Sequence, residues 1–61
     1  MDEGLSPADC EAQALACQLN GDYRRAAEYW RLAAELCWSS LLKAEYDANA
    51  EQCDAYDRAT A

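Results

Sequence analysis

The stretch Asn20–Leu36, NGDYRRAAEYWRLAAEL, decides the fold that we predict for this chain. Asn20 and Gly21 tolerate the left-handed backbone conformation that often ends a helix, and Asp22 can cap a helix that starts after it. Small and aromatic residues then recur at helical spacing: Tyr23, Ala26, Ala27, Trp30, Ala33, Ala34 and Cys37. Small residues let two antiparallel helices approach closely. The stretch therefore predicts the turn and the second helix of a helical hairpin.

The first helix of this hairpin is predicted to begin at Ser6-Pro7-Ala8-Asp9 and to end near Leu19. Ser6 can cap it, Pro7 suits the first helical position, and Asp9 lies where a capping-box carboxylate reaches back. One stripe of apolar residues consists of Leu5, Ala8, Ala12, Leu15, Ala16 and Leu19, and a second one consists of Cys10, Ala14 and Cys17. We expect one stripe to contact the hairpin partner and the other to contact a third helix or a second subunit. The predicted core comprises Leu15, Leu19, Tyr23, Ala26, Trp30, Ala33 and Cys37.

The apolar pattern changes phase after Trp38. The stronger stripe is Trp38, Leu42, Tyr46, Asn49, Cys53 and Tyr56, about a third of a turn from the continuation of the preceding face. Ser39-Ser40 lies at the shift, and Ser is a good N-cap. We predict a third helix from about Leu41 to Asp57. One long, bent second helix is the alternative, because no Gly or Pro forces a break. Residues 1–5 and 59–61 are expected to fray.

The composition favours an all-α fold in one small domain of 61 residues. Thr60 is the only β-branched residue, whereas Ala, Leu, Glu, Gln and Arg are good helix formers. A chain of this length buries too little surface to be more than marginally stable alone. We therefore expect help from a partner or from self-association, and predict a homodimer.

Charge and residue types exclude several classes of function. The formal charge of −7 argues against direct nucleic-acid binding, which needs Lys and Arg. We expect no signal peptide and no membrane span, and hence a cytoplasmic location. The chain has no His, no Gly-rich phosphate loop and no Cys pair at zinc-knuckle spacing. We therefore predict no catalytic residues, no metal and no cofactor, and four reduced, partly buried thiols.

Aromatic residues are the candidates for contact with other proteins, because Tyr and Trp dominate interface hot spots. The residues predicted to form a partner or dimer interface are Trp38, Leu42, Tyr46, Cys53, Tyr56 and Tyr29. The alternative is that the third helix folds over the hairpin and buries them. Asp47, Glu51 and Asp54 form an acidic line that either faces solvent or docks on a basic surface.

The hairpin resembles a single tetratricopeptide-type unit, in Gly21-Asp22-Tyr23, Ala26, Tyr29-Trp30, Ala33 and Glu35-Leu36, with Ala14 on the first helix. The whole chain resembles the ANR family of small bacterial and phage-borne negative regulators of transcription. That resemblance lies in a G-x-Y-x-x-A-A-x-x-W-x-x-A-A-x-L core: Gly21, Tyr23, Ala26, Ala27, Trp30, Ala33, Ala34 and Leu36. Cys53 matches the Cys that closes the family's short last helix. Glu45, Tyr46, Asp47 and Asn49 depart from the family, which favours Trp and Arg there.

The resemblance implies dimerisation and inhibition of a bacterial transcription regulator by direct protein contact. Two alternatives remain. One is an acidic decoy that mimics nucleic-acid phosphates and blocks a basic groove, as some anti-CRISPR proteins do. The other is a simple oligomerisation module.

Overall fold

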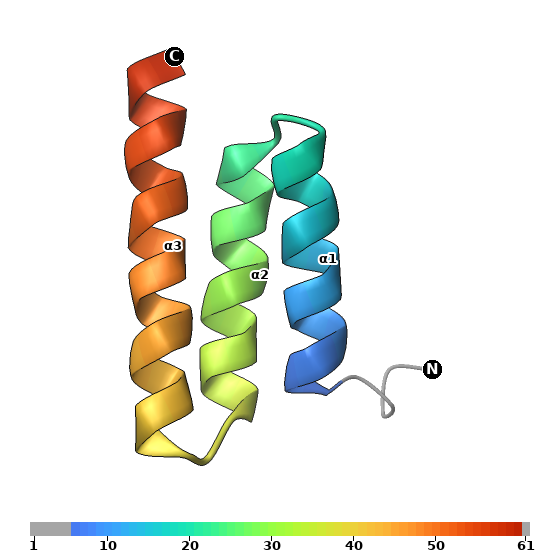
Figure 1. The fold of residues 1–61 in the computed structure, drawn as a ribbon, viewed down its shortest axis with the longest axis vertical. Helices are drawn as coiled ribbons and strands as arrows, with labels where there is room; N and C mark the ends of the chain where they lie inside the picture. Colours follow the sequence, from blue (N-terminus) through green and yellow to red (C-terminus); the bar gives the residue numbers. More distant parts are fainter. Residues whose placement is uncertain (1–5, 61) are drawn as a thin grey trace.

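Three α-helices make up almost all of the part of the chain that the structure, a computed structural model, describes, residues 6–60. They are α1 (Pro7–Leu19), α2 (Tyr23–Leu36) and α3 (Ser40–Thr60), and they run up, down and up again (Figure 1). No strand occurs within these residues, so the predicted all-α class and the hairpin followed by a third helix are confirmed. The predicted fraying of residues 1–5 and Ala61, and the place of Leu5 in its stripe, lie outside the described residues.

The ends of α1 have the capping interactions that the sequence predicts. The Ser6 hydroxyl accepts a hydrogen bond from the Asp9 backbone N–H (3.3 Å), and the Asp9 carboxylate accepts one from the Ser6 backbone N–H (3.1 Å). At the other end Gly21 has a φ of +79°, a conformation that costs little only for Gly. The backbone N–H groups of Gly21 and Asp22 donate to the carbonyls of Gln18 and Cys17. This is a Schellman motif, which reverses the chain after Leu19.

A short connection separates α2 from α3. Cys37 has an extended backbone conformation (ψ 134°), so the α-helix ends at Leu36. The Lys43 N–H then donates to the Ser39 carbonyl, which marks Ser39 as the residue that starts α3. The alternative of one long, bent helix is therefore wrong. The change of phase in the apolar pattern after Trp38 marks the start of the separate third helix.

The last helix is longer than predicted, since it begins at Ser40 and continues through Ala59 and Thr60. Their fraying stays a prediction, since the structure shows only that they have helical backbone conformation. The Thr60 hydroxyl donates to the carbonyls of Tyr56 (3.0 Å) and Asp57 (3.3 Å), and no Gly or Pro interrupts the last turns.

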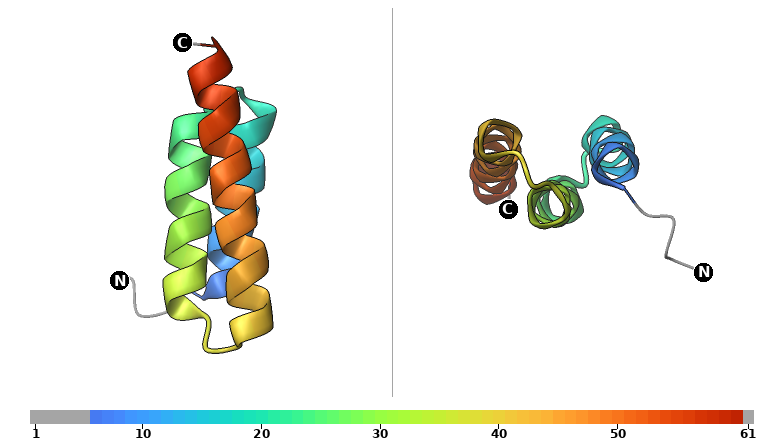
Figure 2. Two further views of the ribbon diagram at one scale, coloured as in Figure 1. Left: turned by 90° about the vertical axis from the view of Figure 1, so that its left-hand side faces the viewer. Right: turned by 90° about the horizontal axis from the view of Figure 1, so that it is seen from below.

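α2 is the central helix. α1 and α3 each pack against α2 but make almost no backbone contact with each other. Viewed from one end, they lie on the same side of α2, so the three helices form an open V (Figure 2). The inner side of this V is a concave face that no fourth helix of the described chain covers.

The core is built mainly from small residues around one tryptophan. Trp30 is 4% exposed, and the other buried residues are Cys10, Ala14, Ala26, Ala27, Ala33, Ala34, Tyr46, Ala50 and Cys53. Tyr23 and Cys37 are half-buried against them. Of the seven predicted core residues, Ala26, Trp30 and Ala33 are therefore buried, and Tyr23 and Cys37 partly so.

Leu15 and Leu19 are the exceptions, with exposed fractions of 46% and 90%. Our prediction that they belong to the core is wrong. α1 turns its second stripe, Cys10, Ala14 and Cys17, toward α2. Those smaller side chains face the alanines of α2 and let the two helices pack closely.

Candidate protein-binding surfaces

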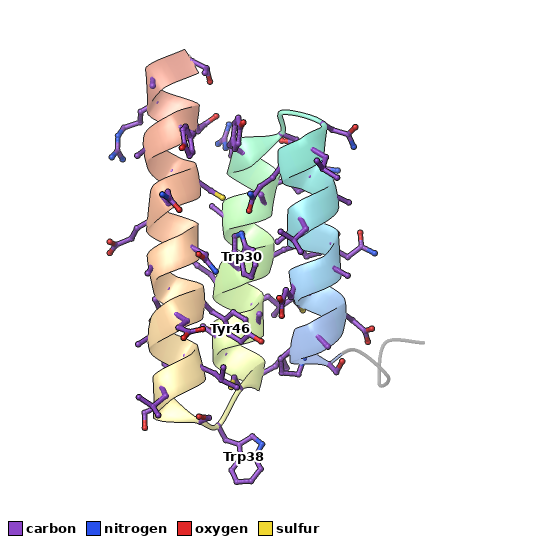
Figure 3. The ribbon with its side chains drawn as sticks, viewed as in Figure 1. Trp30, Trp38 and Tyr46 are labelled. Carbon is purple, nitrogen blue, oxygen red and sulfur yellow. The ribbon has the colours of Figure 1, made fainter. Side chains whose placement is uncertain are left out.

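One group of exposed apolar side chains lies around the connection between α2 and α3. We call it the tip patch: Leu36, Trp38, Leu41 and Leu42. Trp38 is 98% exposed and Leu41 82%, and the Trp38 ring points away from all three helices (Figure 3). A tryptophan held wholly in water gains nothing from folding. Its large apolar surface is available to another protein.

The six residues predicted to form a partner or dimer interface do not share one surface. Trp38, Leu42 and Tyr56 are exposed, whereas Tyr29 is half-buried against the core. Tyr46 and Cys53 are buried between α3 and α2, so they belong to the core and the prediction for these two is wrong. The reason is that α3 uses the middle of its offset stripe to pack on α2 and leaves only the ends of that stripe in solvent.

A cluster of hydrogen-bonded and stacked side chains connects the three helices. The Trp30 indole N–H donates to Gln18 Oε1 (2.7 Å), and the same oxygen accepts from the Cys53 thiol (3.4 Å). Tyr46 stacks on Trp30, with ring centroids 5.8 Å apart, and its hydroxyl donates to Glu11 Oε1 (3.4 Å). Figure 3 shows the Trp30 ring above the Tyr46 ring in the middle of the bundle. Sequence reasoning missed Gln18, although a Gln one residue after Cys17 lies beside the buried stripe.

The environment of this cluster disfavours ionisation of the Tyr46 hydroxyl and of the Cys53 thiol. Burial raises the pKa of the Tyr46 hydroxyl, and the nearby carboxylate of Glu11 raises it further. Burial likewise raises the pKa of the Cys53 thiol, against the opposing effect of the Trp30 indole. A thiol that stays protonated is a poor nucleophile, so burial lowers the reactivity of Cys53.

A second apolar surface lies at the opposite end of the bundle from Trp38. We call it the α1–α3 groove, an open hollow of about 540 Å³ lined by Leu15, Gln18, Leu19, Tyr23 and Tyr56. The rings of Tyr23 and Tyr56 stack, with centroids 5.2 Å apart, and join α2 to α3 at its base. Tyr56 is 51% exposed, and with the two leucines it forms apolar walls on both sides.

The acidic line on α3 is partly neutralised by α2. The Asp54 carboxylate accepts a hydrogen bond from the Arg31 guanidinium and forms an ion pair with it. That hydrogen bond raises the pKa of Arg31, and the charges of Asp54, Asp47 and Glu51 add to the effect. Asp47 and Glu51 are exposed. The line therefore presents two exposed carboxylates and a third that is held by the bundle itself.

All four cysteines are free thiols, with Cys10 and Cys53 buried and Cys17 and Cys37 half-buried. Burial raises the pKa of Cys10, and the charge of Asp9 adds to this shift. Within residues 6–60, no three His, Cys, Asp or Glu side chains are placed to hold a metal ion.

Among the described helices, none is both long enough and apolar enough to cross a membrane. Comparison with known proteins gave no matching family model, no similar curated protein and no similar solved structure.

Proposed function

We propose that this chain is a small, non-enzymatic regulator, of the phage or mobile-element type, that binds and inhibits a bacterial transcription regulator by direct protein contact. The observation that carries the proposal is the exposure of the tip patch, above all of Trp38 at 98% and Leu41 at 82%. Trp is among the residues that contribute most to binding energy at protein interfaces. In so small a chain, two such side chains left in water are best accounted for by a partner that covers them.

The choice of target rests on the resemblance to ANR proteins. The eight positions of that resemblance lie in the turn before α2 and along α2, where most of them belong to the packed core. They support a shared fold more directly than a shared partner. Homodimerisation, a cytoplasmic location and the lack of direct nucleic-acid contact belong to the same proposal. The net charge of −7 supports the last of these.

The test combines capture with a functional readout. The tagged wild-type chain is used to capture proteins from a bacterial lysate, mass spectrometry identifies them, and a promoter reporter of the captured regulator measures inhibition. Trp38→Ala is the test variant. Arg58→Ala, which shortens an exposed side chain in the last turn of α3, is the matched control.

We expect the wild type and Arg58→Ala to capture a transcription regulator and to lower its reporter signal. Trp38→Ala should lose both effects while keeping its helical circular dichroism spectrum. Capture of no transcription regulator, or equal inhibition by Trp38→Ala, would refute the proposal.

The decoy alternative predicts a different response. An acidic mimic depends on its exposed carboxylates and is weakened by salt. Replacing Asp47 and Glu51 by Lys should then abolish inhibition, and Trp38→Ala should leave it intact. The ion pair between Asp54 and Arg31 makes the decoy the weaker candidate, since it withdraws one carboxylate from the line.

A further inference from the structure

The α1–α3 groove is a second binding surface, separate from the tip patch. We infer that it binds an amphipathic helix of another protein, one that carries Lys or Arg beside its apolar stripe. The bound helix would lie on the concave face as a fourth helix of the bundle. This inference does not depend on the identity of the target proposed above.

The shape of the concave face suits a helix. α1 and α3 both pack on α2 and lie on the same side of it (Figure 2), and they contact each other mainly through side chains, where Tyr46 and Cys53 reach α1. The α1–α3 groove is the trough that these two outer helices leave between them, with Tyr23 of α2 at its base. Four-helix bundles fill such a trough with one more helix, packed nearly parallel or antiparallel to its neighbours. The hollow lies within the size range of ligand pockets, about 300–1,000 Å³, but it is open along one side. An open trough matches a row of side chains better than an enclosed small molecule.

An exposed apolar stripe of α1 adjoins the hollow through Leu15 and Leu19. The exposed stripe of this helix is Ala8, Ala12, Leu15, Ala16 and Leu19. It has the spacing of a buried helix face, yet no element of the described chain covers it. Ala12 and Ala16 lie about 160° around the helix from the buried Ala14, on the side of α1 away from α2. Leu15 and Leu19 are therefore the residues of this stripe that would pack between the side chains of a docked helix.

The charges around the groove determine what kind of helix fits. Glu11 lies one turn before Leu15 on α1 and accepts a hydrogen bond from the Tyr46 hydroxyl. Glu45 is exposed and lies three turns before Tyr56 on the same face of α3, so each wall carries a carboxylate. None of the five basic residues lines the groove. Arg24 and Arg25 line a separate hollow with Asp22 and Glu28, and Arg31 is paired with Asp54. The two remaining basic residues lie on α3, at positions 43 and 58, about 140° and 160° around the helix from Tyr56.

An apolar trough with carboxylates on both walls complements a helix whose apolar stripe is flanked by Lys or Arg. A second copy of this chain is a poor occupant, because it brings another net charge of −7 and the same two carboxylates. The observations therefore favour a basic amphipathic helix from a different protein.

The experiment uses synthetic peptides as the probe. A fluorescein-labelled peptide of Leu and Lys, with Leu at helical spacing, is titrated with the full chain and followed by fluorescence anisotropy. A peptide of the same composition in scrambled order, and one with Glu in place of Lys, serve as controls. Each titration is repeated with Leu19→Asn and with Leu41→Asn, since both leucines are exposed and only Leu19 lines the groove.

We expect the amphipathic basic peptide to bind and both control peptides to bind at least about tenfold more weakly. Leu19→Asn should weaken binding about tenfold, the loss expected when one buried leucine contact is removed, while Leu41→Asn changes it less than about twofold. Glu45→Gln should weaken binding and lower its salt dependence. Glu51→Gln, a change at an exposed position on the other side of α3, should not.

Several results would overturn the inference. Equal binding of the scrambled peptide would indicate plain charge attraction, and unchanged binding by Leu19→Asn would indicate another site. A dimer in light scattering that becomes a monomer in Leu19→Asn would assign the groove to a second copy. Since these readouts involve no transcription regulator, their failure is distinguishable from a failure of the function proposed for the tip patch.

Discussion

The two tryptophans provide a direct test of the fold, because the same substitution should destabilise the chain strongly at one position and hardly at all at the other. Trp30 is 4% exposed and Trp38 98%. An aromatic ring buries about 150–250 Å² of surface, which at about 25 cal/mol per Å² corresponds to about 4–6 kcal/mol. This range is an upper estimate, because an unfolded chain already buries part of its apolar surface. Measured Trp→Ala substitutions in cores cost about 3–5 kcal/mol, and we expect Trp30→Ala to fall in that range.

Such a loss is close to the total stability of the chain. At about 0.05–0.15 kcal/mol per residue, 61 residues correspond to a free energy of unfolding of roughly 3–9 kcal/mol. Trp30→Ala is therefore expected to be largely unfolded at 25 °C. Trp30→Phe retains most of the ring but removes the hydrogen bond to Gln18, and it should cost about 1–2 kcal/mol.

The assay is urea unfolding followed by circular dichroism at 222 nm, with wild type, Trp30→Phe, Trp30→Ala and Trp38→Ala compared at one protein concentration. We expect Trp38→Ala to lie within about 0.5 kcal/mol of the wild type, as surface substitutions do. A loss of more than about 1 kcal/mol in Trp38→Ala, at the same unfolding slope, would show that this ring is packed. An unchanged midpoint in Trp30→Phe would refute the central role of the Trp30 cluster.

Three further predictions concern single features of the fold. Gly21→Ala should lower the free energy of unfolding by about 1 kcal/mol in the same assay, because Gly21 has a φ of +79°. Asp54→Asn should cost less than about 1 kcal/mol, because its partner Arg31 is half-exposed, and the difference from wild type should shrink as NaCl is added. The free energy of unfolding should also fall as the pH rises above about 8.5, the ordinary pKa of a thiol. Burial raises the pKa of Cys10 and Cys53, so these thiols lose their protons at a lower pH in the unfolded chain than in the folded one. Urea midpoints between pH 7 and pH 10 measure this loss, which should be smaller in Cys53→Ala.

The local features of the fold were predictable from the sequence because each depends on a few neighbouring residues. The capping box of Ser6 and Asp9, the reversal at Gly21 and the cap by Asp22 are all present in the structure. The face of α2 was also predicted correctly, since α2 is in contact with both other helices and has a single apolar face. Periodicity is most reliable for such a helix.

The face that α1 turns inward was not predictable in the same way. The helix has two apolar stripes, and periodicity alone does not rank them. Hydrophobicity favours the stripe with Leu15 and Leu19, but the stripe with Cys10 and Ala14 is the one buried. What decides between them is the shape of the facing helix, where alanines accept small side chains at close range. That information lies in α2 and in the pairing of the two helices, not in the sequence of α1.

The same limit of periodicity explains why several residues of the candidate surfaces were predicted wrongly. Apolar side chains that look like core in the sequence, such as Leu15 and Leu19, are exposed in the structure, while Tyr46, which looked available for a partner, is buried. These exposed apolar residues are the observation behind both proposals above, since clustered apolar residues at a surface often mark interaction sites. Two such regions, the tip patch and the α1–α3 groove, lie at opposite ends of the bundle and share no residue. Under the two proposals the tip patch and the groove bind different protein segments, and the effects of Trp38→Ala and Leu19→Asn should then be independent of each other.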